Sequence, residues 1–172
     1  LPDGPGTHVC PSYRGQYYQA EHQAMAQHAV WARPYYIFYD IEAYWSGAIQ
    51  DAQRCSRCVT RYKEGNYKDW DAFREAMGLE IHQSLRSAVD QALAQSGLKQ
   101  SITYGSYRTE PITRLNDGLF SFLKLYPDLL QVGMPSLYVA GNAQAVATSI
   151  SRNRALLDRN DIIPWLSTGT YG

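Results

Sequence analysis

Two acidic residues with the spacing of a paired-carboxylate site end a hydrophobic, aromatic run. The run covers residues 34–42, and its acids are Asp40 and Glu42, two positions apart. Side chains alternate between the faces of a β-strand, so these two carboxylates would point the same way. Such a pair can protonate a leaving oxygen and stabilise the positive charge that develops when a glycosidic bond breaks. We therefore predict Asp40 and Glu42 as catalytic residues, although the same acids could cap the next helix or pair with an arginine.

The neighbouring residues give each acid a role. Tyr44 and Trp45 follow the pair, and burial beside them would raise the pKa of Glu42 and keep it protonated, as a general acid must be. Asp40 would be its electrostatic partner, one pleat deeper along the strand. If the substrate carries an N-acetyl group, Asp40 could orient that group as an internal nucleophile. Otherwise a second acid must come from another strand, and Glu110 is the best placed in the sequence.

Strand-like runs alternate with helical patterns along the whole chain. Strands are predicted at residues 7–12, 35–42, 101–107, 129–138 and 161–168, and helices at 16–31, 69–96 and 142–159. The helix at 69–96 has one continuous apolar stripe, and Gly97 supplies its stop. A weaker helix is predicted around 118–125. The polar segment 46–68 is either a functional loop or contains a short helix.

This alternation predicts an α/β fold with parallel strands joined by right-handed crossovers. A small open sheet and the later part of a TIM barrel both fit the order. We favour the barrel, because a nucleotide-binding sheet would carry a Gly-rich turn after an early strand, and none is present. Residues 1–172 would then form one partial (β/α)8 barrel domain of about five β/α units, truncated at both ends. The missing barrel segments would come from the rest of the polypeptide or from another chain.

Each predicted strand ends in polar or aromatic residues, which is where parallel α/β folds place their chemistry. Aromatic rings also offer apolar platforms to sugars. Plain packing is the alternative for the aromatic residues, and pairing with Asp40 is the alternative for Arg108. The predicted substrate-binding residues are Tyr44, Trp45, Tyr107, Arg108, Tyr138 and Trp165.

The order of these features resembles a glycoside hydrolase barrel. The segment Val-Cys-Pro-Ser-Tyr-Arg at 9–14, a helix, and a strand ending in Asp40-Ile41-Glu42 are similar to strands three and four of many such enzymes. The triplet resembles the end of the family 18 chitinase motif, in which the Glu is the general acid and the Asp orients the N-acetyl group. A comparable Asp-x-Glu ends a strand in family 25 lysozymes, and Trp165 resembles the tryptophan that floors the chitinase sugar site. The two upstream acids of the chitinase motif are replaced here by Tyr35 and Phe38.

Composition narrows the classes of partner. The 172 residues have a formal net charge of +0, so neither nucleic acid nor an anionic membrane finds a surplus of positive charge. No apolar run reaches the roughly 18 residues of a membrane span. We expect a carbohydrate substrate, no cofactor, and no nucleic-acid or membrane partner. The location stays open, with a lean towards an extracellular or lumenal setting.

Cys55 and Cys58 have the spacing of a metal knuckle or redox motif, and Cys10 is left over. A closed zinc site needs about four ligands, and neither a second CxxC nor a His-x₃-His pattern follows. We therefore predict no metal site, and a local disulfide or free thiols, in this polar segment.

Two functions from other classes remain open. The chain could be a catalytically inactive barrel that still binds carbohydrate, which the missing upstream acids favour. It could also be a structural or assembly protein whose aromatic surface makes subunit contacts.

Overall fold

The computed structural model describes residues 9–39, 48–109, 125–137, 142–157 and 162–166. The chain divides into two compact units. The first is a helical unit that contains α1, α2, α3 and α4. The second is a sheet unit that contains strands β1 to β4 and helix α6.

The long helix α4, Trp70–Gln95, is the backbone of the helical unit. The predicted apolar stripe is buried from Phe73 to Leu93, whereas Trp70, its first residue, is half-buried. Asp69 caps its first turn, because the Asp69 carboxylate accepts a hydrogen bond of 2.8 Å from the Ala72 N–H. At the other end the N–H of Leu98 reaches the carbonyl of Leu93, and Gly97 adopts a positive φ of 73°. This is a Schellman motif, so the helix ends where its sequence signals predict.

We expect Asp69→Ala to lower the free energy of unfolding of the helical unit by about 1 kcal/mol, the usual value of an N-cap side chain. The loss follows because the Ala72 N–H would have no side-chain acceptor. Urea denaturation of both proteins measures the change. Lys68→Ala, at the exposed neighbouring position, is the matched control and should leave the denaturation midpoint unchanged.

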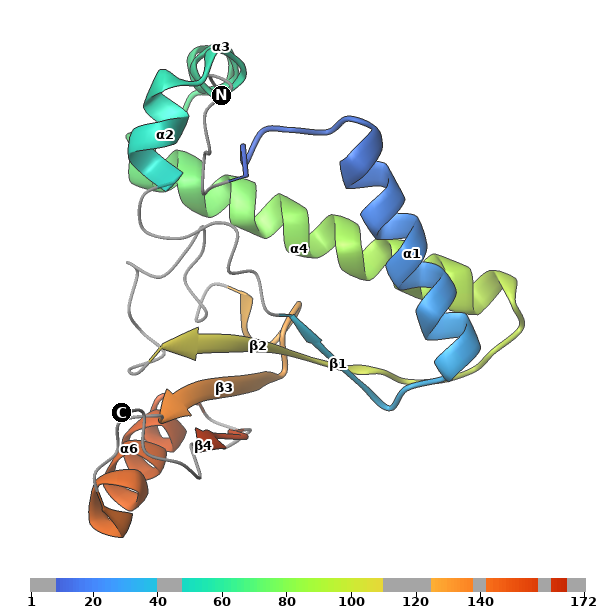
Figure 1. The fold of residues 1–172 in the computed structure, drawn as a ribbon, viewed down its shortest axis with the longest axis vertical. Coiled ribbons are helices and arrows are strands. Elements are labelled where there is room, and N and C mark those ends of the chain that lie inside the picture. The colour runs from blue at the N-terminus through green and yellow to red at the C-terminus, as the bar shows by residue number, and fades with distance from the viewer. Residues whose placement is uncertain (1–8, 40–47, 110–124, 138–141, 158–161, 167–172) are drawn as a thin grey trace, which may run out of the picture. The chain divides into compact units, whose positions relative to one another are not determined.

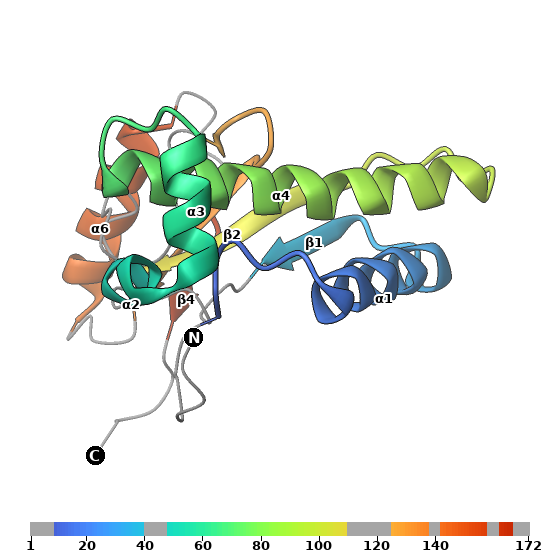
Figure 2. The ribbon, with the colours of Figure 1, turned by 90° about the horizontal axis from the view of Figure 1, so that it is seen from above.

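The other helices of this unit pack along α4. Helix α1, Gln16–Ala32, lies across it, and α2, Ala48–Arg54, and α3, Ser56–Glu64, lie together near its N-terminal end (Figures 1 and 2). Arg33 ends α1 in the left-handed conformation directly before Pro34, and a proline disfavours helical backbone in the residue before it. An aromatic cluster joins α3 to α4: the ring of Tyr62 stacks on Trp70 at 4.2 Å, and the edge of Phe73 meets both.

The sheet unit contains four parallel strands in the order β1-β2-β3-β4. They are β1, Tyr36–Tyr39, β2, Thr103–Thr109, β3, Val132–Leu137, and β4, Trp165–Leu166. Helix α6, Ala143–Ala155, contacts β3 and is capped by the side chain of Asn142. The parallel pairing predicted from the alternation of strands and helices is confirmed for these strands.

The partial (β/α)8 barrel is wrong. Helices contain far more residues than strands in the described part of the chain, and the parallel sheet is small. A barrel requires each crossover helix to pack on the strands that it joins, whereas α1 and α4 pack against each other within the helical unit. The segment 46–68, for which a functional loop or a short helix was expected, contains the two helices α2 and α3. The strand expected at 7–12 is absent over residues 9–12, which form a turn.

Candidate functional site

The parallel register brings the carboxyl ends of the strands to one edge of the sheet. Tyr39 lies opposite Ser106, Arg108 opposite Pro135, and Ser136 opposite Trp165. The arrowheads of β2 and β3 point the same way in Figure 1. Ligands of open parallel sheets bind at this edge, so it is the first candidate site.

The residues predicted for catalysis and binding fall at or just beyond these strand ends along the chain. Tyr107 and Arg108 lie in β2, and Trp165 opens β4. Asp40 directly follows β1, Glu110 directly follows β2, and Tyr138 directly follows β3. The predicted residues that lie outside the described part are Asp40, Glu42, Tyr44, Trp45, Glu110 and Tyr138.

Buried aromatic rings fix the end of β1. The rings of Tyr39 and Tyr104 stack with centroids 5.9 Å apart and an interplanar angle of 15°, and both side chains are buried. The Ser106 hydroxyl donates a hydrogen bond of 3.3 Å to the Tyr39 carbonyl. The residue that immediately precedes Asp40 is therefore held by packing and by a hydrogen bond from the neighbouring strand.

Tyr36 is the first residue of β1, and its side chain extends across β2 towards β3. Its hydroxyl donates a hydrogen bond to the sulfur of Met134, and a Cβ at Gly105 would collide with the Tyr36 ring. Glycine at position 105 thus lets the ring pass. Burial raises the pKa of Tyr36 to about 12, so the hydroxyl keeps its proton and remains a donor at neutral pH.

A second candidate site is the thiol cluster, formed by Cys10, Cys55 and Cys58 in the helical unit. The Cys10 sulfur lies 3.4 Å from that of Cys55 and 3.5 Å from that of Cys58. All three sulfurs lie within 4.8 Å of one another. Their residues are 6%, 2% and 0% exposed, respectively. Cys55 is the N-cap of α3 and Cys58 lies in its first turn, so a helix begins where a polar loop was one of the alternatives.

Hydrogen bonds shift the pKa values of two thiols of the cluster in opposite directions. A hydrogen bond from Cys58 lowers the pKa of Cys10, and hydrogen bonds from Cys55, the Ser12 backbone and the Arg57 side chain act in the same direction against the effect of burial. The hydrogen bond to Cys10 raises the pKa of Cys58, and burial raises it further. The pKa of Cys10 is therefore lowered and that of Cys58 is raised, each mainly by the hydrogen bond between the two thiols.

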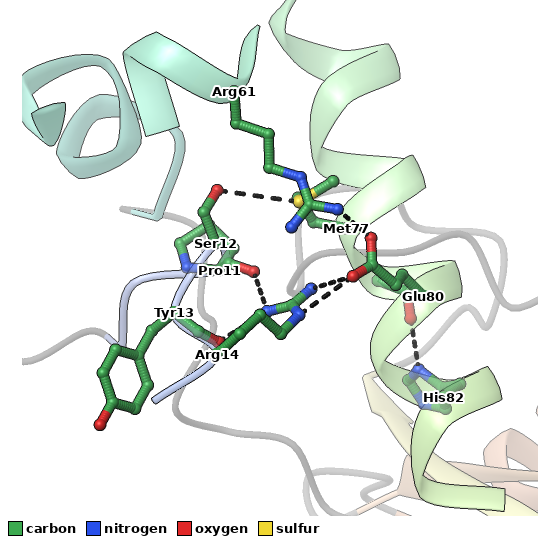
Figure 3. Close-up of polar contacts among 9 residues, drawn as sticks. Pro11, Ser12, Tyr13, Arg14, Arg61, Met77, Glu80 and His82 are labelled. Carbon is green, nitrogen blue, oxygen red and sulfur yellow. Dashed lines mark hydrogen bonds and ion pairs between the residues drawn. The ribbon is translucent and has the colours of Figure 1, made fainter. Parts of the chain in front are cut away.

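An ion-pair network holds the segment that carries Cys10. Arg14 donates a hydrogen bond of 3.0 Å from Nε to the Glu80 carboxylate, which also pairs with Arg61 of α3 (Figure 3). Arg14 Nη1 donates to the carbonyls of Pro11, at 2.9 Å, and Tyr13, at 2.7 Å. Glu80 thus ties both the N-terminal segment and α3 to α4.

The CxxC pair is visible in the sequence, but the sequence does not show that Cys10 joins it in one cluster. Forty-five positions separate Cys10 from Cys55, so no local spacing rule connects them. The available signal was the odd cysteine count: Cys10 had no assigned partner, and all the cysteines of the chain meet in one cluster.

No family model, curated protein or solved structure matches this chain. The resemblance to family 18 and family 25 glycoside hydrolases therefore stays an interpretation of its sequence. Among the described helices, none combines the length and the apolar character needed to cross a membrane.

Proposed function

We propose that this protein is a glycoside hydrolase whose active site lies at the carboxyl edge of the parallel sheet. Glu42 is the general acid and Asp40 its electrostatic partner. One observation carries the proposal: the parallel register gathers the strand ends that precede or contain the predicted catalytic and binding residues. The proposal does not require a barrel, because open parallel sheets also bind ligands at this edge.

The register also supports the choice of a second acid. Strand β1 pairs with β2, and Glu110 directly follows β2 in the sequence. Neighbouring strands are about 4.8 Å apart. Retaining glycosidases hold their two carboxyl groups about 5–5.5 Å apart. We therefore propose Glu110, which follows the strand next to β1 in the sequence, as the nucleophile that acts with Glu42.

The chemistry follows from these roles. Glu42 delivers a proton to the leaving oxygen as the glycosidic bond breaks, and the nucleophile captures the oxocarbenium-like carbon. Water, which gives a proton back to Glu42, then hydrolyses this intermediate. On an N-acetylated sugar, Asp40 orients the acetamido group as the internal nucleophile. On a plain β-linked sugar, Glu110 supplies the nucleophile, and the aromatic residues near the edge support the ring.

The test compares hydrolysis of N-acetylated and plain β-linked oligosaccharides by the purified chain and by Glu110→Gln. We expect Glu110→Gln to lower the rate on plain substrates by roughly 10²-fold or more, because the nucleophile is lost, and to leave the rate on N-acetylated substrates unchanged. Equal losses on both substrate classes would contradict the assignment of Glu110. Glu21→Gln, on the exposed surface of α1, is the control for loss of a carboxylate.

A parent chain that cleaves none of these substrates would contradict the hydrolase proposal itself. Retained binding of the same oligosaccharides would then identify the carbohydrate-binding alternative. Absence of binding together with a mass that increases with protein concentration would identify the assembly alternative.

A further inference from the structure

The thiol cluster has the dimensions of a metal site. Zinc–thiolate bonds are about 2.3 Å long, so sulfurs at the corners of a tetrahedron around zinc are about 3.8 Å apart. The Cys10 sulfur lies 3.4 and 3.5 Å from its two neighbours, and the whole set lies within 4.8 Å. Shifts of a few tenths of an ångström at Cys10 would give it metal-site spacing to both neighbours.

The ligands of this cluster are all soft. Among the described residues, no histidine or carboxylate joins the three cysteines. Thiolate sulfur selects monovalent copper and zinc over magnesium, calcium and manganese, which prefer oxygen ligands. Burial of all three side chains would also shield bound metal from bulk water.

The surroundings favour the negative charge that thiolates bring. Cys55 is the N-cap of α3 and Cys58 lies in its first turn, so two of the three ligands lie at the positive end of the helix dipole. Arg57 also lies in this first turn, and its positively charged guanidinium lies 5.3 Å from the centre of the ring of Tyr13, in the segment that carries Cys10. Two separate features therefore offset charge at the cluster.

Contacts with α4 also fix the positions of the segments that carry the cysteines. The Ser12 hydroxyl contacts the Met77 sulfur of α4 at 3.8 Å, and Arg14 reaches Glu80 on the same helix (Figure 3). The segment from Cys10 to Arg14 is thereby attached to α4, and Arg61 attaches α3 to the same carboxylate. Ligands that are held before the metal arrives lose less conformational entropy when it binds.

We propose that Cys10, Cys55 and Cys58 together bind one thiophilic d¹⁰ cation, either Zn²⁺ or Cu⁺. This replaces the prediction of no metal site that the CxxC pair alone gave. The proposal is independent of the hydrolase assignment, because its residues belong to the helical unit and its test measures binding.

The experiment uses the full chain, reduced and kept without oxygen, and titrated with Zn²⁺ or with Cu⁺ against a competing chelator. We expect one ion per chain. Each of Cys10→Ser, Cys55→Ser and Cys58→Ser should weaken binding by roughly 100-fold or more, since even residues behind the ligands are worth 10–100-fold in metal affinity. Ser56→Ala, inside the CxxC segment but exposed, should bind as the parent does.

The two ions are distinguished by their coordination. Zn²⁺ takes four ligands, whereas Cu⁺ is satisfied by the three sulfurs. Tighter binding of either Zn²⁺ or Cu⁺ by the parent identifies the ion while supporting the shared site.

A second measurement covers the case in which a serine variant does not fold. Metal at about 100 times its dissociation constant should raise the melting temperature of the reduced parent by roughly 5–10 °C, because it binds the folded state. The proposal is overturned if the parent shows neither stoichiometric binding nor this rise. It is equally overturned if Cys10→Ser binds as the parent does, or if two of the cysteines remain joined as a disulfide in the folded, reductant-treated protein.

Discussion

Replacing Glu42 with glutamine is expected to lower the rate of oligosaccharide hydrolysis by roughly 10²–10⁴-fold, the usual contribution of general acid catalysis. Glutamine keeps the shape of the side chain and its capacity to hydrogen-bond, but it has no proton to transfer to the leaving oxygen. Substrate affinity should change little. Initial rates and KM, measured on whichever oligosaccharide the parent cleaves, separate the two effects.

Glu21→Gln again controls for loss of a surface carboxylate and should retain parental kinetics. Wild-type turnover by Glu42→Gln would remove Glu42 from the catalytic role. A rise in KM with unchanged kcat would instead mean that Glu42 binds substrate and does not transfer a proton.

Truncating Phe73 to alanine should destabilise the helical unit by about 3–5 kcal/mol, the typical cost of deleting a buried aromatic side chain. Phe73 is 1% exposed and makes edge contacts with Tyr62, Tyr67 and Trp70. Its loss leaves a cavity and removes these aromatic contacts. The midpoint of urea denaturation, followed by tryptophan fluorescence, measures the change.

Leu79→Ala tests whether the effect depends on burial. Leu79 lies on the same helix but is 37% exposed, so the same experiment should show a much smaller shift. Comparable losses in the two variants would mean that burial of Phe73 in the aromatic cluster does not account for the effect.

Sequence patterns predicted the helices and strands well where caps and apolar stripes act between residues that are close in the sequence. The apolar stripe, Asp69 and Gly97 define α4 within one residue at each end, because caps and stripes act through neighbours in the sequence. The runs around Tyr36, Thr103 and Val132 form parallel strands as expected. The two-residue β4 is shorter than its apolar run suggested.

The arrangement of these elements was not predictable in the same way. Strand–helix alternation is shared by barrels, open sheets and chains whose helices pack mainly with one another. The choice depends on which helix faces meet, and here α1 meets α4. The mixed segment at 46–68 had too few apolar residues to reveal two short helices, whose positions depend on packing at α3 through Tyr62 and Cys58.

The two candidate sites differ in the same way, because one is predicted from neighbouring residues and the other depends on residues far apart in the sequence. The spacing of Asp40 and Glu42 predicts a catalytic pair from three residues, and the register of β1 and β2 supports the edge at which they would act. The thiol cluster required a contact across 45 positions and a helix start at Cys55. Neither feature is encoded by periodicity, so only the folded chain brings Cys10 to the pair.

The contact between Cys10 and Cys55 also has a consequence for the unfolded chain. A covalent or coordinate bond between them would close a loop of about 45 residues. In the chain-entropy treatment of cross-links, such closure removes enough disorder from the unfolded ensemble to favour folding by about 4 kcal/mol. A bond formed at this buried cluster would thus restrict every unfolded conformation of the segment between Cys10 and Cys55, which lies in the N-terminal third of the chain.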